Sequence, residues 1–186
     1  TILMALHQIT HITGNADTNS YIRYEKFLIK FCDIVKNFSD VEIIVKLHPS
    51  QNKHTDQIKK LFKKMDSSIP VYHSKSINEL MPISDVLVCV SPEGFDPSTV
   101  ILEGIIQGKP VMNIILDNNL YEFQYVKDKA VLSVFFNDDL ESNLKNILFD
   151  EKIKNTLIQN GKNHVKNYLS NPGNSSAYFA KIINSL

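Results

Sequence analysis

Residues 84–114 read SDVLVCVSPEGFDPSTVILEGIIQGKPVMNI, and in this stretch two apolar runs flank a segment with helical composition. The first run, residues 85–90, leads into a polar loop, and the second, residues 111–115, begins after Pro110. We expect a helix at residues 98–107, because Gly108 follows it, and a glycine just past a helix commonly ends it. A strand, a helix and a strand in this order predict two parallel strands joined by a crossover helix.

The same alternation extends over all 186 residues, with no internal repeat and no domain boundary. We predict strands at residues 2–6, 41–47, 71–72, 85–90, 111–115 and 130–135. We predict helices at residues 21–35, 56–65, 76–81, 98–107, 140–148, 151–160 and 177–183. The fold class is therefore α/β. One Rossmann-like domain is expected over residues 1–186, a doubly wound parallel sheet of about six strands with helices on both faces and a helical C-terminal tail.

The balance of charges narrows the classes of partner. Lysine plus arginine equals aspartate plus glutamate at 20 each, which gives no support for nucleic acid or an anionic membrane as the main partner. Arg23 is the only arginine, so backbone amides must carry most of any phosphate binding. Cys32 and Cys89 have apolar neighbours and are expected to be buried free thiols, which fits a reducing, cytoplasmic setting. No apolar run approaches the roughly 20 residues of a membrane span.

Ligands of open α/β sheets lie outside the carboxyl ends of the strands. This rule selects four loops, at residues 8–19, 48–55, 73–76 and 91–97. In the first of them, Gly14 permits close approach of the backbone to a ligand. The loops together predict a ligand site at one edge of the sheet.

The helix expected at residues 98–107 begins with two hydroxyl side chains, Ser98 and Thr99. The unpaired amides of a helix N-terminus attract phosphate, and these hydroxyls add donors there. Glu103, four residues beyond Thr99 and on a similar face, could accept hydrogen bonds from both ribose hydroxyls of a nucleotide, and Gly104 leaves room for close approach. The alternative is that Ser98 only caps the helix and Glu103 is a solvated surface charge.

His48 ends the second strand, where Pro49 directs the imidazole into the loop layer. It could donate to a phosphate or a sugar hydroxyl; alternatively, it only satisfies a neighbouring loop carbonyl. Lys46, two residues earlier on the same face, could support an anion or pair with a carboxylate. The sequence has neither a GxGxxG fingerprint nor a P-loop, and its histidines lack a metal-site spacing. We therefore expect no nicotinamide cofactor and no metal.

Three segments resemble the C-terminal domain of GT-B-fold glycosyltransferases. They are KLHPS at 46–50, INELMPISDVLV at 77–88 and STVILEGIIQGKPVMNI at 98–114. The nearest relatives by motif are polysaccharide-type transferases, wall-polymer glycerophosphotransferases and UDP-N-acetylglucosamine 2-epimerases. The resemblance implies that this chain is the C-terminal, donor-binding half of a two-domain enzyme whose N-terminal acceptor domain is missing. The chain also opens directly on a strand without an initiator methionine, which indicates a fragment of a longer protein.

The resemblance also implies roles for individual residues. Ser98 and Thr99 would bind the diphosphate and Glu103 the ribose. His73 and Ser74, within the segment 72–77, would frame the base. Further residues that would face the phosphates or the sugar are His48, Lys46 and Gly14, and His48 is the catalytic candidate. The loop at 91–97, SPEGFDP, departs from the Ser-Gly-Gly type of the epimerases, and its Glu93 and Asp96 would repel a diphosphate unless they point away or contact sugar hydroxyls.

The function expected from the resemblance is donor binding in a glycosyltransferase of polysaccharide or glycan biosynthesis. The ligand would be a nucleotide sugar, expected to be UDP-linked, with no further cofactor, and the full-length protein could associate peripherally with a membrane. Two alternatives remain: half of a 2-epimerase, or a non-catalytic α/β domain that binds a ligand or a partner.

Overall fold

The computed structural model describes residues 1–8, 18–51, 54–91, 98–116, 122–169 and 173–185. Within these residues six strands form one sheet, in the order β3-β2-β1-β4-β5-β6, and every neighbouring pair is parallel. The strands are β1 (Ile2–Leu6), β2 (Ile43–Lys46), β3 (Val71–Tyr72), β4 (Val86–Ser91), β5 (Val111–Ile115) and β6 (Leu132–Phe135). The predicted Rossmann-like parallel sheet is confirmed, and its order reverses between β1 and β4.

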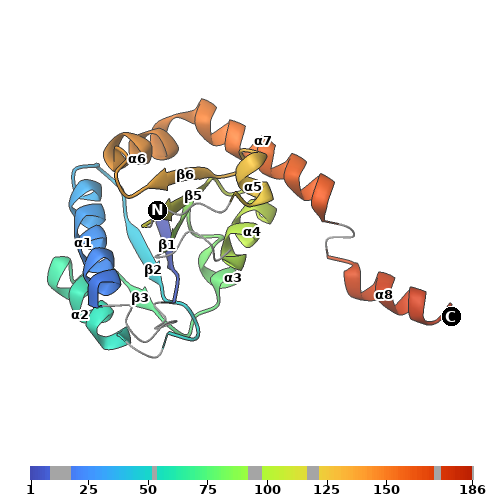
Figure 1. The fold of residues 1–186 in the computed structure, drawn as a ribbon, viewed down its shortest axis with the longest axis horizontal. Helices are drawn as coiled ribbons and strands as arrows, with labels where there is room; N and C mark the ends of the chain where they lie inside the picture. Colours follow the sequence, from blue (N-terminus) through green and yellow to red (C-terminus); the bar gives the residue numbers. More distant parts are fainter. Residues whose placement is uncertain (9–17, 52–53, 92–97, 117–121, 170–172, 186) are drawn as a thin grey trace.

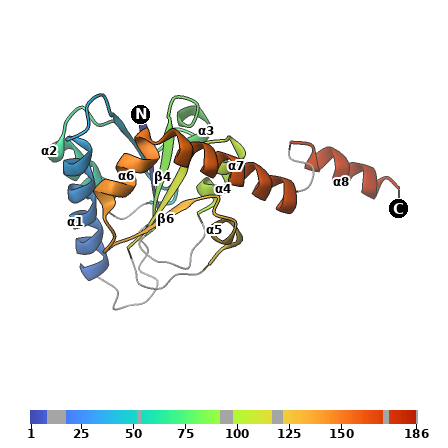
Figure 2. The same ribbon diagram turned by 90° about the horizontal axis from the view of Figure 1, so that it is seen from above.

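Helices cover both faces of the sheet (Figures 1 and 2). They are α1 (Thr18–Val35), α2 (Thr55–Met65), α3 (Ile77–Leu80), α4 (Thr99–Ile106), α5 (Gln124–Lys127), α6 (Leu140–Phe149), α7 (Glu151–Tyr168) and α8 (Ser175–Ile183). Apolar side chains of α1, α2 and α6 form one core cluster with the sheet, and those of α3, α4 and α5 form a second cluster on the opposite face.

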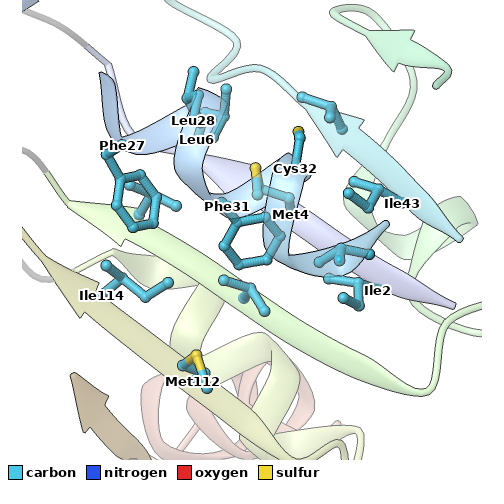
Figure 3. Close-up of a cluster of buried hydrophobic side chains, with 14 of the residues drawn as sticks. Ile2, Met4, Leu6, Phe27, Leu28, Phe31, Cys32, Ile43, Met112 and Ile114 are labelled. Carbon is cyan, nitrogen blue, oxygen red and sulfur yellow. The ribbon is translucent and has the colours of Figure 1, made fainter. Parts of the chain in front are cut away.

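The central strands are buried on both faces, as expected for a parallel sheet covered by helices. In β1 the side chains alternate, so that Met4 packs beneath α1 while Leu3 faces the cluster around α4. Figure 3 shows the first of these clusters, where residues of α1 lie over β1, β2 and β5. Its labelled residues are Ile2, Met4, Leu6, Phe27, Leu28, Phe31, Cys32, Ile43, Met112 and Ile114. Both cysteines are buried free thiols, as predicted.

Two helices differ most from the sequence-based expectation. α7 continues to Tyr168, beyond the predicted end at residue 160, because Gly161 lies inside it and allows close packing on α4. A Cβ at Gly161 would lie 3.1 Å from Cγ2 of Ile105. α5 was not predicted at all, because a single turn of four residues has too short a periodic pattern to detect.

α8 forms the C-terminal part of the helical tail and extends away from the sheet (Figures 1 and 2). None of its residues is buried, and Tyr178, Phe179, Ile182 and Ile183 are exposed. Among the helices that the structure describes, none combines the length and the apolar character needed to cross a membrane.

Candidate functional site

A cavity of about 720 Å³ lies where β1, β2 and β3 end and α4 begins. It is next to the point where the strand order reverses, the usual ligand position in doubly wound sheets. Its polar lining residues are His7, Gln8, Lys46, His48, His73, Ser74, Lys75, Ser76, Asn78, Ser98, Thr99 and Glu103. The structure thus brings together every predicted site residue except Gly14, which lies outside the described residues.

The N-terminus of α4 forms one wall of the cavity, through Ser98, Thr99 and Val100. Ser98 occupies the N-cap position, yet its hydroxyl accepts no hydrogen bond from the helix. The Ile101 amide donates to the Ser98 carbonyl at 3.0 Å, and the amides before it, as the first of the helix, have no acceptor within the helix. These amides and the positive end of the helix dipole can therefore receive an anion.

Glu103 lies one turn further along α4 and lines the same cavity. Its Oε2 atom is buried and has no hydrogen-bond partner within the described part of the chain. Leaving a buried acceptor unpaired costs about 1–3 kcal/mol, and more when the group is charged. Burial, and secondarily the charge of Glu103, raises the pKa of the Cys89 thiol, which places the carboxylate near β4. The carboxylate is not the solvated surface charge of the alternative interpretation.

Gly104 serves helix packing and not ligand approach, which corrects the role suggested by the sequence. A Cβ at this position would lie 2.5 Å from Cδ2 of Leu87 and 3.0 Å from Cγ2 of Val111. The missing side chain therefore lets α4 lie close to β4 and β5. This close contact holds the neighbouring Glu103 at the edge of the cavity.

Lys46 is the most deeply buried cation of the site, with 6% of its surface exposed. Its Nζ donates to the carbonyl of Leu47 at 2.5 Å and to the carbonyl of His73 at 3.0 Å. No carboxylate of the described residues pairs with it, so the second of the two predicted roles, ion pairing, is not observed. Burial lowers the pKa of Lys46. The ammonium group ties β2 to the segment after β3, which forms another wall of the cavity.

The hydrogen bonds of three histidines determine which ring nitrogens carry protons. The Ser50 amide donates to Nδ1 of His48 at 3.1 Å, so neutral His48 carries its proton on Nε2. Nε2 of His73 donates to the Pro49 carbonyl at 3.1 Å, and Nδ1 of His7 donates to the Gln8 carbonyl at 3.2 Å. His48 thus accepts a hydrogen bond from the backbone of its own loop.

Sequence reasoning missed His7 as a site residue, although its ring centroid lies 5.8 Å from that of His48. His7 directly follows β1, so the rule that ligands lie at the carboxyl ends of strands could have selected it. Asn78, in the short helix α3, was also missed, although it directly follows the predicted segment 72–77. Lys75, in the predicted loop at 73–76, lines the cavity as well. Among the described residues, no three His, Cys, Asp or Glu side chains are grouped to hold a metal ion.

No protein-family model matches the sequence. No curated protein matches it either. Solved structures do match. HepE of Anabaena, solved in complex with UDP-glucose, has a TM-score of 0.63 at 13% identity, and the match covers 100% of this chain and 49% of HepE. A proposed UDP-N-acetylglucosamine 2-epimerase from Listeria monocytogenes has a TM-score of 0.60 at 14% identity, over 85% of this chain and 38% of that protein.

A third match is WaaG, a glycosyltransferase involved in lipopolysaccharide biosynthesis. Its TM-score is 0.55 at 15% identity, over 98% of this chain and 46% of WaaG. The chain therefore spans less than half the length of these three solved proteins. Together with the strand order, these matches show that the chain has the fold of one Rossmann-like domain of the GT-B-type proteins.

Proposed function

We propose that this chain is the nucleotide-sugar-binding half of a GT-B glycosyltransferase. The observation that carries the proposal is the buried Oε2 of Glu103, which has no hydrogen-bond partner among the described residues and lies at a cavity that also contains the N-terminus of α4. A ribose offers two adjacent hydroxyl donors to such a carboxylate, while the diphosphate matches the helix amides. The solved match with UDP-glucose bound supports a uridine nucleotide sugar as the donor.

The spacing along α4 agrees with a nucleotide. Thr99 and Glu103 lie four residues apart, which corresponds to about 6 Å along the helix axis. A nucleotide could thus place its phosphates at Ser98 and Thr99 and its ribose at Glu103. Segment 73–78, which lines the opposite wall and includes His73 and Ser74, would frame the base.

The proposed reaction is a displacement at the anomeric carbon. An acceptor oxygen forms a bond to that carbon, the bond to the diphosphate oxygen breaks, and the diphosphate leaves with the electron pair. The acceptor hydroxyl gives its proton to a base that the acceptor-binding half would supply. The amides of α4 and the Lys46 ammonium stabilise the charge on the leaving group. His48 lines the same cavity but does not fit a general base through Nδ1, because the Ser50 amide donates to that nitrogen.

A 2-epimerase is the second candidate, supported by the fold match to the Listeria protein. It would use the same nucleotide-sugar cavity with different chemistry. Product analysis of the full-length protein separates the two reactions: a transferase consumes an acceptor, whereas an epimerase converts the nucleotide sugar without one.

The first test is a thermal-shift panel with UDP, GDP, CDP, CMP, ADP and their common sugar conjugates. A ligand at 100 times its Kd should add about 2.7 kcal/mol to the free energy of unfolding, a visible rise in Tm. A rise with one base only would support the donor site and identify the donor class. A flat panel at millimolar ligand would contradict nucleotide binding by this domain and favour the non-catalytic alternative.

Replacement of Glu103 tests the ribose assignment. We expect Glu103→Ala to weaken binding of the nucleoside diphosphate by about 1.5–3 kcal/mol, because charged hydrogen bonds to the ribose are lost. The measurement is isothermal titration calorimetry, with circular dichroism to confirm the fold. Glu141→Ala, on the exposed face of α6 and outside the cavity, is the matched control and should keep the parent Kd. Unchanged affinity in Glu103→Ala would contradict the assignment.

A further inference from the structure

The chain as a whole is neutral, but its charges are divided along the sequence. Residues 151–186 contain five lysines and one glutamate, a net charge of +4. Residues 1–150 contain 15 basic and 19 acidic residues, a net charge of −4. A charge asymmetry of this kind is typical of a chain that meets an anionic partner through its basic part. The overall balance therefore conceals a basic segment, which is the part that forms α7 and α8.

The lysines of α7 are exposed at the end of the helix that leads to α8. Lys162 and Lys166 are four residues apart in the last two turns of α7, so they share one face. Like charges at this spacing slightly disfavour a helix, and no carboxylate of the described residues pairs with either of them. Lys154, by contrast, pairs with Glu151 at the other end of α7. The positive charge next to α8 is thus left for an external partner.

α8 has an apolar face that no described part of the chain covers. Of the eleven large apolar side chains that are exposed in the described residues, four belong to this nine-residue helix. They are Tyr178, Phe179, Ile182 and Ile183, which are 44–63% exposed. At about 100° per residue, the four lie within about 140° of one another around the helix axis. Such a grouping on one short face indicates contact with an apolar surface outside the chain.

We propose that α8 binds in the interface of a membrane that contains anionic phospholipid. Its apolar face contacts the acyl chains, and the lysines at the end of α7 contact the headgroups. Nine residues are too few to span a bilayer, so the helix lies in the plane of the interface. A nucleic acid would match the lysines but not the apolar face, whereas anionic lipid matches both. The inference goes beyond nucleotide binding and does not depend on it.

The division of charge also fixes an orientation. An anionic surface attracts the +4 segment and repels the −4 segment, and at 0.1 M salt these forces act over about 10 Å. α8 extends away from the sheet (Figures 1 and 2), so it can reach the membrane while the sheet domain stays outside the headgroup layer. The cavity at the carboxyl ends of the strands then remains open to water-soluble ligands.

The first test is a fluorescent reporter on α8. The chain contains no tryptophan, so Phe179→Trp introduces a single one. We expect its emission to shift to shorter wavelength on vesicles of POPC and POPG in a ratio of 7:3, and much less on POPC alone. Ile83→Trp, at a 60% exposed position between α3 and β4, is the control and should not shift. No shift of Phe179→Trp on the anionic vesicles would overturn the proposal and leave a partner protein as the occupant of the face.

Co-sedimentation with the same vesicles tests the apolar contacts. Phe179→Ser combined with Ile183→Ser should weaken binding about tenfold or more, while circular dichroism stays unchanged, because neither side chain is buried. Binding that this double variant retains in full would overturn the proposal. So would light scattering that shows a lipid-free dimer of the parent chain and a monomer of the variant, since a second copy would then cover the face.

A matched pair of charge variants tests the headgroup contacts. Lys162→Gln combined with Lys166→Gln should weaken binding to the anionic vesicles about tenfold or more. Lys59→Gln combined with Lys63→Gln removes two exposed charges at the same spacing from α2 and should keep the parent affinity. Raising NaCl from 0.1 to 0.5 M should weaken the parent several-fold. An equal loss in both lysine pairs, or binding to POPC alone that is as tight and independent of salt, would overturn the assignment of anionic lipid to this segment.

Discussion

Two oppositely charged side chains that line the cavity differ in their hydrogen bonding. Lys46 donates to two carbonyl oxygens, whereas Oε2 of Glu103 has no partner among the described residues. Burial of an unpaired carboxylate oxygen disfavours folding. The proposed nucleotide would supply the missing donor, because a ribose hydroxyl could donate to Oε2.

Asp128 and His164 form a pair of a different kind, remote from the cavity. Nδ1 of His164, a buried side chain, donates to Oδ2 of Asp128 at 2.8 Å. This bond, and next the one from Gln124, holds the pKa of the Asp128 carboxyl below its ordinary range. A carboxyl with a depressed pKa stabilises the fold above its unfolded pKa of about 3.9, and that contribution is lost as pH falls through the folded pKa.

We therefore expect Asp128→Asn to lower the midpoint of urea unfolding at pH 7. The gap between variant and parent should narrow as pH falls below about 4, because the parent carboxyl then becomes neutral as well. Midpoints measured from pH 2.5 to pH 7 check this. Asp33→Asn removes the same charge from an exposed position and should have little effect. A gap that is constant with pH would mean that the charged hydrogen bond is not the cause.

Among the elements, the eight-residue helix α4 both packs on the sheet and lines the cavity. Its Gly104 contacts the sheet, and the adjacent Glu103 lines the cavity, so the two requirements fall on neighbouring residues. A change in how closely α4 approaches the sheet would also move the N-terminal amides and the carboxylate.

Gly104→Ala tests this close packing. Alanine favours a helix interior over glycine by about 1 kcal/mol, but here the new methyl would lie 2.5 Å from Leu87, which is fully buried. Overpacking of a core typically costs about 1–3 kcal/mol, so we expect a net loss of stability. Urea unfolding measures it, with Ile106→Ala on the exposed side of the same helix as the control. A Gly104→Ala protein that is more stable than the parent would show that the side chains of Leu87 and Val111 move aside at little cost in free energy.

In the whole molecule, the order of the strands determines where the site lies. β1 and β4 are neighbours in the sheet although 79 residues lie between the end of β1 at Leu6 and the start of β4 at Val86. Helices connected to β1 and β4 run on opposite faces, which opens the space beyond the carboxyl ends of the strands. The cavity lies in that space.

α8 contributes little to the stability of the sheet domain, because none of its residues is buried. We expect a chain that ends at Leu169 to keep the free energy of unfolding of the parent within about 0.5 kcal/mol. Urea unfolding of the two proteins, followed by circular dichroism, checks this. A substantially lower midpoint for the shortened chain would indicate that the tail packs on the domain in solution.

Much of the fold was predictable from local patterns. The apolar runs and their β-branched residues located the strands to within about two residues. The helix predicted at residues 76–81 is α3, whose start is capped by the Ser76 and Glu79 side chains. The same patterns failed at Gly161, where contact with α4 overrides the low helix propensity of glycine. They also failed at α5, whose four residues are held by their surroundings.

The sequence by itself determined the α/β class, the strand ends that carry polar residues, and the hydroxyl and carboxylate groups of α4. These features depend on contacts between residues a few positions apart, and such contacts leave a periodic pattern. Only the tertiary structure decided that the ends of β1, β2 and β3 meet α4 at one cavity, that Gly104 faces the sheet, and which nitrogens of His48 and His73 carry protons. These features depend on atoms far apart in the chain, and the order in which parallel strands pair is not encoded in any local stretch of residues.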